Sequence, residues 1–258
     1  MEKELTFNQH VKLAIESGVA PIELKYYPIV NVDGPEAIAF RTATSINSLM
    51  FGELKEDDYK HISDKRLCGI ELLKHNIMHA IGAIKAFQKA NKQVGFISVR
   101  CPGEIIERTS LYELVKGVLQ QNPSVDPSKL CLEFPENLLE FDAEKVKYAV
   151  LDMKLLKVRT ALQGVGKEEF KVSKLTSIPV DFAIIDKSAS EWAGSRNKPQ
   201  LFNSLLSYIS AMGVESIAVG DENKKKEIRY SDAVGFYLEG TEPITLEAAV
   251  EMAEEADV

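Results

Sequence analysis

The chain has 258 residues, of which 45% are hydrophobic and 27% are charged, an ordinary globular composition. Its formal net charge of −8 argues against nucleic acid as a partner, because phosphate backbones are bound by basic surfaces. No run of roughly 18 uncharged apolar residues occurs, and the N-terminus lacks an apolar signal segment, so we expect a cytoplasmic protein that does not enter a membrane. The three cysteines (Cys68, Cys101 and Cys131) are widely spaced without a CxxC pair, which predicts buried thiols rather than a zinc site.

Helix and strand patterns alternate along the chain. Apolar spacing predicts a helix over Phe7–Ser17 that ends at Gly18, followed by strands Ile22–Val32 and Ala37–Thr44 around the turn Asp33-Gly34-Pro35. A short turn between two strands predicts an antiparallel hairpin. Further strands are expected at residues 94–99, 130–134, 159–162, 180–185, 216–219 and 235–238. Helices are expected at residues 69–91, 111–121 (capped by Thr109 or Ser110), 143–156, 200–212, 222–230 and 246–256.

This order predicts an α/β fold, a (β/α)8 TIM-type barrel with an antiparallel first strand pair. Eight expected strands are mostly separated by one helix each, which is typical of parallel βα units that close into a barrel. The length is close to the roughly 250 residues of such barrels, and no linker-like segment divides the chain. We therefore expect a single domain over residues 1–258, with residues 1–20 leading into it.

Barrels of this type carry their chemistry at the C-terminal ends of the strands. Four acidic residues fall at such ends or just beyond them: Glu133, Glu136, Asp186 and Glu222. Carboxylates on three strand ends could hold a hard cation such as Mg²⁺ or Mn²⁺. The neighbouring strand ends do not support that interpretation, because they offer Val99-Arg100-Cys101, Gln163-Gly164 and Val219-Gly220, with no Asp or Asn among them.

Two other features have a structural and a functional interpretation. His75 and His79 have the i, i+4 spacing of a zinc-binding pair, but they lack an HExxH glutamate and a third ligand, so we favour a structural role. Trp192 is the only tryptophan; a packing role is the default, and an exposed interface anchor is the alternative.

Six short motifs in order are similar to one family, the EAL domains that hydrolyse or bind cyclic di-GMP. YYPIV at Tyr26–Val30 resembles YQPIV, EAIAFR at Glu36–Arg41 resembles EALLR, LCLEFPEN at Leu130–Asn137 resembles LELEITES, SKLTSIPVDFAIIDKS at Ser173–Ser188 resembles SYLKRLPVDTLKIDRS, IAVGDEN at Ile217–Asn223 resembles IAEGVET, and GFYLEG at Gly235–Gly240 resembles QGYLFS. The resemblance covers nearly the whole chain, from about Phe7 onward.

The resemblance implies that most metal ligands of the family are replaced. With Arg41 as the arginine of EALLR, the metal-binding glutamate falls on Ala37; a slip of one residue would place it on Glu36. The other ligand and active-site positions fall on Val99, Gln163, Gly164, Ile184 and Val219. Of the central ligand set only Glu133 is retained, while Arg41, Glu136, Asp186 and Glu222 match supporting positions.

Two-metal hydrolysis requires several carboxylates around the ions, so the resemblance predicts a protein without phosphodiesterase activity, bound metal or other cofactor. We expect a regulator that binds a protein partner. The alternative is a cyclic di-GMP receptor that does not cleave its ligand, with Arg41 as a phosphate clamp. A third reading is an active enzyme that uses the four acidic residues. Homodimerisation is plausible because the family often pairs near the fifth and sixth strand ends, although the loop Gly164–Phe170 has diverged there.

Overall fold

The computed structural model describes residues 6–17, 21–64, 68–195, 199–228, 232–238 and 240–254. The strands within these ranges are β1 (Ile22–Val30), β2 (Ala37–Ser48), β3 (Gly52–Lys55), β4 (Ile97–Arg100), β5 (Leu130–Phe134), β6 (Arg159–Val165), β7 (Phe182–Ile185), β8 (Glu215–Gly220) and β9 (Gly235–Leu238). The α-helices are α1 (Phe7–Ser17), α2 (Glu56–Ser63), α3 (Cys68–Lys89), α4 (Ile105–Arg108), α5 (Leu111–Gln120), α6 (Ala143–Leu155), α7 (Lys187–Ser190), α8 (Pro199–Ala211), α9 (Glu222–Ile228) and α10 (Leu246–Met252). Three 3-10 turns complete the described elements: η1 (Pro127–Lys129), η2 (Glu136–Glu140) and η3 (Val172–Ser177).

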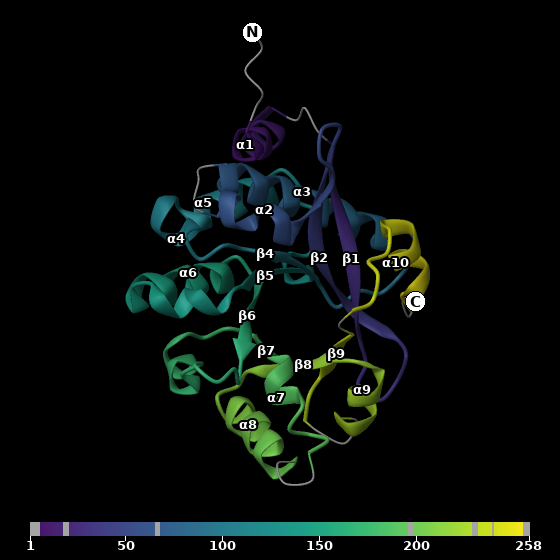
Figure 1. Cartoon of the computed structure of the whole chain (residues 1–258), viewed down its shortest axis with the longest axis vertical. Coiled ribbons are helices and arrows are strands. Elements are labelled where there is room, and N and C mark those ends of the chain that lie inside the picture. The colour runs from purple at the N-terminus through teal and green to yellow at the C-terminus, as the bar shows by residue number, and fades with distance from the viewer. Residues whose placement is uncertain are drawn as a thin grey trace.

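The strands close into a barrel with helices around it (Figure 1). Their order is β1-β9-β8-β7-β6-β5-β4-β2, and β1 also pairs with β2, which completes the ring. β1 is antiparallel to both of its neighbours, β2 and β9. All neighbouring pairs in the order β2-β4-β5-β6-β7-β8-β9 are parallel. The predicted barrel class and the antiparallel first strand pair are therefore confirmed.

Two apolar clusters divide the side chains of the strands. The larger lies between the outer faces of the strands and the helices, and it includes Phe40, Val99 and Leu132. The smaller cluster fills the barrel interior: Ile29, Ala39, Phe96, Cys131, Ala161, Phe182, Ile184 and Ile217. Because successive residues of a strand point to opposite faces, the cluster that a residue joins shows which way it points.

A β-bulge in β2 determines which residues of this strand face inward. The pairing with β1 shifts between Ile29 and Val30, so that Val30 lies opposite Ala37 and Ile29 lies opposite Ala39. Ala37 joins the outer cluster, whereas Ile38 and Ala39 both contact the inner one. Such an extra residue re-aims the side chains that follow it. In β2, Arg41 consequently points into the barrel mouth.

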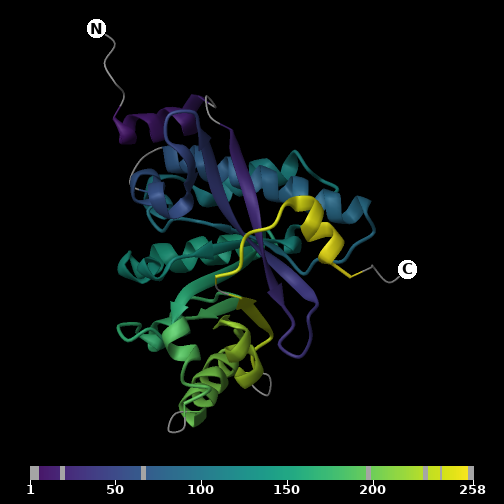
Figure 2. The ribbon, with the colours of Figure 1, turned by 45° about the vertical axis from the view of Figure 1, so that its right-hand side comes forward.

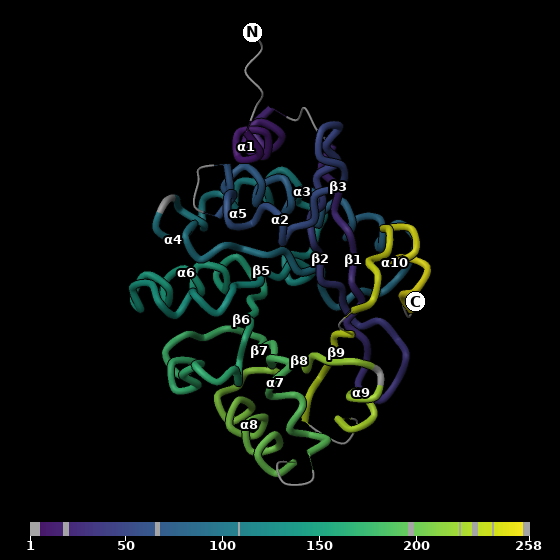
Figure 3. Tube along the Cα trace, viewed as in Figure 1, coloured from purple at the N-terminus to yellow at the C-terminus, as the bar shows by residue number. Residues whose placement is uncertain are grey.

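The β1–β2 pair extends beyond the barrel rim and carries a part of the fold that the sequence patterns did not predict. β2 reaches Ser48 rather than Thr44, turns back into β3, and leads directly into α2. α1, α2 and the start of α3 cover this extension around a separate apolar cluster that includes Ile46, Tyr59 and Leu72. Figure 2 and Figure 3 show α1 and β3 at the end of the molecule opposite α8.

Most predicted elements are present with shifted ends. β4 spans Ile97–Arg100 rather than starting at Val94, and α10 ends at Met252. The predicted stop at Gly18 and the predicted helix end at Tyr230 lie outside the described residues. None of the helices in the described ranges has the length and apolar character required to cross a membrane.

Candidate functional site at the barrel mouth

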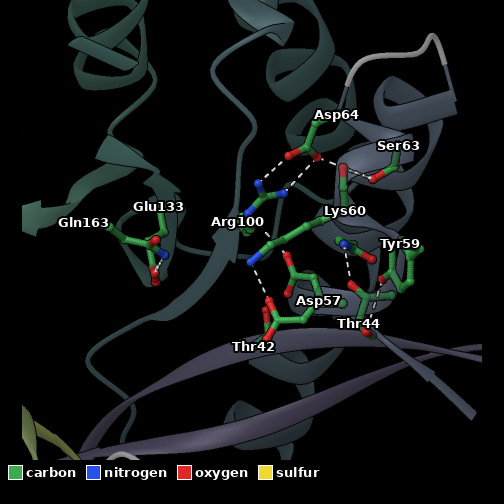
Figure 4. Close-up of polar contacts among 12 residues, drawn as sticks. Thr42, Thr44, Asp57, Tyr59, Lys60, Ser63, Asp64, Arg100, Glu133 and Gln163 are labelled. Carbon is green, nitrogen blue, oxygen red and sulfur yellow. Dashed lines mark hydrogen bonds and ion pairs between the residues drawn. The ribbon is translucent and has the colours of Figure 1, made fainter. Parts of the chain in front are cut away.

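Glu133 lies at the centre of a polar network at the C-terminal ends of the strands. It is on β5, and its side chain is 2% exposed. Arg41 of β2 contacts both carboxylate oxygens: its Nε donates to Oε2 at 2.9 Å, and its Nη2 lies 2.5 Å from Oε1. Ser98 of β4 donates to Oε2 at 3.0 Å, and Gln163 of β6 donates to Oε1 (Figure 4). Oε2 thus accepts two hydrogen bonds, while Oε1 accepts one and forms the ion pair with Nη2, so both oxygens have two polar contacts.

The network links four neighbouring strands, β2, β4, β5 and β6. Arg41 makes a two-pronged contact of the kind that is strongest between a guanidinium and a carboxylate. Burial alone would lower the pKa of Arg41, but the charge of Glu133 and its hydrogen bond raise that pKa above its ordinary value. Arg41 also lies over the Tyr237 ring, 4.8 Å from its centroid. The mouth therefore holds a fixed cation beside its one buried carboxylate.

A second ionic cluster lies beside the first, where β4 meets α2. Arg100 donates to both carboxylate oxygens of Asp64, one of them at 2.9 Å (Figure 4). Its Nε lies 3.4 Å from Oε1 of Glu56. Burial raises the pKa of Glu56, and the charges of Arg100 and Arg41 lower it only in part. Arg100 thus fastens the end of β4 to both ends of α2.

The mouth-facing residue at the end of β4 is Arg100 and not Val99, which corrects the match made from the motifs. Val99 is fully buried in the outer cluster, whereas Ser98 contacts Glu133 and Arg100 lines a pocket at the mouth. The sequence match placed the family's asparagine on Val99. A residue that faces the helices cannot share a cation with Glu133, so that match was wrong by one residue.

The structure does not place Ala37 or Glu36, the two residues matched to the EAL glutamate, beside Glu133. Ala37 is four residues before Arg41, a distance of about 13 Å along a strand, and it points into the outer cluster. Glu36 precedes β2 in the hairpin turn. Ligands of one ion lie within a few ångströms of each other, and the residue of β2 that meets Glu133 is Arg41.

The opposite half of the mouth is apolar. Ile184 of β7 belongs to the inner cluster, and Val219 of β8 packs against it. Gly164 of β6 has a φ of 75°, a conformation that favours glycine, and it places no side chain in the mouth. These positions offer neither a ligand for a cation nor a group that transfers a proton.

Among the predicted site residues whose side chains the structure describes, Arg41 and Glu133 are brought together. Glu136 forms a 2.6 Å ion pair with Lys167 on the surface. Asp186 caps the short helix α7 by accepting a hydrogen bond from the Ser188 backbone at 2.9 Å. The side chain of Glu222 lies outside the described residues.

The described residues do not fit the ions that the family resemblance implies. They contain no group of three or more His, Cys, Asp or Glu side chains that could hold a metal. His75 and His79 stack with their ring centroids 4.1 Å apart, and no third ligand joins them in the described ranges. Glu133 is the retained carboxylate, and its oxygens are occupied by Arg41, Ser98 and Gln163.

Two concave features flank the mouth. A pocket of about 230 Å³ is lined by residues of β1, β2, β3, α2, β4 and β9, including Tyr27, Arg41, Arg100 and Tyr237. A wider groove of about 830 Å³ lies between α8 and the segment after β6, with Phe170, Trp192, Leu201 and Tyr208 among its lining residues. Leu201 and Tyr208 are 48% and 44% exposed, so apolar surface is accessible there.

Sequence reasoning missed Ser98, Arg100, Asp64 and Glu56. One signal was available for two of them, because Ser98 and Arg100 are the alternate residues of a strand whose other positions, Ile97 and Val99, are apolar. No comparable signal marked Glu56 and Asp64. They reach the mouth only because α2 follows the unpredicted strand β3.

The family model for the EAL domain matches residues 11–236. This match spans well over half of the chain, and the protein therefore belongs to the EAL domain family. No curated protein matches the sequence.

Solved structures of EAL proteins share the fold at low sequence identity. The cAMP-bound form of the EAL enzyme Bd1971 is 18% identical, with a TM-score of 0.82 over 95% of this chain and 69% of that one. The PaMucR phosphodiesterase in complex with cyclic di-GMP is 17% identical, with a TM-score of 0.81 over 95% of this chain and all of that one. The FimX EAL domain from Pseudomonas aeruginosa bound to cyclic di-GMP is 14% identical, with a TM-score of 0.78 over 96% and 98% of the two chains.

Proposed function

We propose that this EAL-domain protein does not hydrolyse cyclic di-GMP and acts by binding a protein partner. The observation that carries the first half is the saturation of Glu133 by Arg41, Ser98 and Gln163. A divalent cation would have to displace a buried guanidinium and would gain one carboxylate in return. Hard cations take six or more oxygen ligands, so this exchange is unfavourable.

The charges around Glu133 support the same conclusion. Arg41 and Arg100 face the mouth from β2 and β4, the strands whose family counterparts supply metal ligands. Two guanidinium groups repel a cation at the place where two-metal chemistry would require one. On the far side, Ile184 and Val219 provide nothing to hold a second ion.

The groove beside α8 supports the second half of the proposal. Trp192 and Tyr208 belong to the residue types that carry most of the binding energy at protein interfaces. Exposed Leu201 extends the apolar surface along the same helix. A groove of this composition suits an apolar segment of a partner protein better than a charged nucleotide.

A cyclic di-GMP receptor is the second candidate, and one observation favours it. The pocket at the mouth combines Arg41 and Arg100 with the aromatic rings of Tyr27 and Tyr237. Guanidinium and aromatic groups recognise phosphates and bases without metal. The structural neighbours PaMucR and FimX were solved with cyclic di-GMP bound.

Turnover of cyclic di-GMP in the presence of Mg²⁺ or Mn²⁺ tests the first half. We expect no turnover above the buffer blank for the intact chain. Turnover that disappears in Glu133→Gln would refute the proposal. Calorimetry in the same buffers distinguishes the cyclic di-GMP receptor from the partner-binding protein. Micromolar binding of cyclic di-GMP without metal would favour the receptor.

Affinity capture from the host lysate tests the second half with a matched pair of variants. We expect a reproducible partner that is lost in Trp192→Ala and retained in Tyr148→Ala, because Tyr148 is 63% exposed on α6 away from the groove. Sedimentation of the purified chain shows whether a second copy occupies the groove instead. A partner captured equally well by both variants would contradict the assignment of the groove.

A further inference from the structure

The pocket at the mouth is built on the β1–β2–β3 extension rather than on the barrel as a whole. Its lining residues come from β1, β2, β3, α2, β4 and β9, with Pro243 beyond β9. None of the lining residues in the described chain belongs to β5, β6, β7 or β8. The open space is therefore confined to one side of the mouth, next to the Arg41–Glu133 ion pair.

The floor of the pocket is a small hollow ringed by cations. Ala43 of β2 lies opposite Lys25 of β1, and Ser45, two residues further on, lies between Lys55 of β3 and Glu23 of β1, the residue that pairs with Lys25. Arg41 precedes Ala43 by two residues and faces the same side of the sheet. Positive side chains from three adjacent strands thus surround a position that carries only a methyl group.

The acidic residues of the pocket belong to its walls, and two of them have cations of their own. Glu56 pairs with Arg100, and Asp57 pairs with Lys60 at 2.5 Å. Glu53 is exposed on β3. Lys25 pairs with Glu23 at 2.9 Å, so its charge is shared with a residue outside the pocket lining.

One buried polar atom points to a ligand. Ser45 is 3% exposed and lines the pocket, yet its hydroxyl has no hydrogen-bond partner among the described residues. A buried hydroxyl without a hydrogen-bond partner destabilises the folded chain. An acceptor placed over Ala43 would satisfy it. An oxyanion is the acceptor that fits best, because the positive side chains of the floor attract its negative charge.

We propose that this hollow binds a compact oxyanion, a phosphate or carboxylate group with at most one small ring attached, and not a cyclic dinucleotide. Its volume of about 230 Å³ is below the roughly 300–1,000 Å³ of pockets that hold drug-sized ligands, and a cyclic dinucleotide is larger than those. The apolar half of the mouth, at Ile184 and Val219, offers the second nucleotide no polar contact. The inference relies on the proposed function in one respect, that no divalent cation occupies the neighbouring Glu133.

Calorimetric titration of the full chain with inorganic phosphate, the one-ring monophosphate ribose 5-phosphate and cyclic di-GMP tests this inference. We expect phosphate and the monophosphate to bind, and cyclic di-GMP to bind no tighter than the monophosphate. Ala43→Leu fills the hollow and Lys55→Ala removes one cation, so each should weaken anion binding at least tenfold. Lys116→Ala, on the exposed face of α5, is the control and should leave binding unchanged.

Three results would overturn the assignment: no binding of any anion, binding unaffected by Ala43→Leu, or cyclic di-GMP binding at least tenfold tighter than the monophosphate. The result with Ala43→Leu counts only if this variant is folded, which its thermal transition verifies. If it does not fold, Lys55→Ala provides the same test, because Lys55 is at an exposed position. Turnover of cyclic di-GMP would refute the proposed function, whereas failure of anion binding alone would refute only this inference.

Discussion

The two halves of the barrel mouth differ in how they are filled. Over β2, β4, β5 and β6, polar and charged side chains converge on Glu133 and satisfy one another. Over β7 and β8, Ile184 and Val219 extend the apolar interior up to the rim. The first half is a charged site whose groups balance one another, while the second half is part of the apolar core.

This difference predicts opposite responses to mutation. An ion pair held by hydrogen bonds is sensitive to the loss of either partner, because the remaining charge is buried alone. An apolar interior tolerates small apolar changes and rejects a charge. Variants in each half therefore test whether the two halves are built as described.

Ile184→Lys should have the largest effect on stability. Ile184 is 5% exposed in the barrel interior, so the new ammonium group would be buried without a partner. A shift of roughly 3 pKa units on burial corresponds to a loss of about 4 kcal/mol at neutral pH. Denaturant unfolding measures the loss. Ile184→Val is the control, with an expected cost of about 1 kcal/mol, and equal effects of the two changes would contradict an apolar half.

Arg41→Ala should lower the free energy of unfolding by about 3–5 kcal/mol, because it leaves the buried Glu133 carboxylate without its cation. Chemical denaturation of Arg41→Ala, Glu133→Gln and the double variant forms a thermodynamic cycle. We expect the double variant to be more stable than Arg41→Ala alone. Additive losses would show that the ion pair does not couple the two residues.

Glu56 should make stability decrease as pH rises. Burial raises its pKa in the folded state, so the folded chain holds this proton at pH values where the unfolded chain has released it. Its contribution to the free energy of unfolding is therefore greatest below the ordinary glutamate value of 4.5 and is lost as pH rises through the raised pKa. The free energy of unfolding, measured across this pH range, should decrease less steeply with pH in Glu56→Gln than in the parent chain. A steeper fall in the variant would reverse the assigned sign.

Lys167→Ala should have the smallest effect, below about 1 kcal/mol. Its ion pair with Glu136 is 2.6 Å long, but the two side chains are 50% and 42% exposed. Exposed pairs contribute little because water and salt screen them. Thermal unfolding with and without salt measures the effect. A loss as large as that of Arg41→Ala would mean that the loop after β6 carries structure that its exposure does not suggest.

The barrel could be predicted from the sequence because its signals are local. Alternating strand and helix patterns located eight strands, and the short turn at Asp33-Gly34-Pro35 predicted the antiparallel pair. β3 and α2 were not predicted, because the strand Gly52–Lys55 is too short for its alternating pattern to be recognised. The loss of α2 from the prediction also removed Glu56 and Asp64 from the candidate site.

The composition of the site could be predicted only in part, because it depends on how strands align. Glu133 was placed correctly at a strand end, and Ile184 and Val219 were matched to mouth positions that the structure fills with apolar atoms. Arg41 was identified as a possible phosphate clamp, but its contact with Glu133 depends on the bulge in β2 and on the stagger of β2 against β5. Motif spacing contains neither quantity. The one-residue error at Val99 is different, because the alternation of Ile97 and Val99 with Ser98 and Arg100 was visible in the sequence.

Binding of Mn²⁺ to the intact chain, followed by the electron paramagnetic resonance of the free ion, tests the central claim most directly. If Arg41 occupies the place of a cation at Glu133, the parent chain and Glu133→Gln should leave the same concentration of free Mn²⁺ in solution. Arg41→Ala should gain no more than weak binding, because it frees one carboxylate that the described residues do not extend to a group of three ligands. Micromolar binding to the parent chain that is lost in Glu133→Gln would show that the guanidinium moves aside, and it would contradict the account.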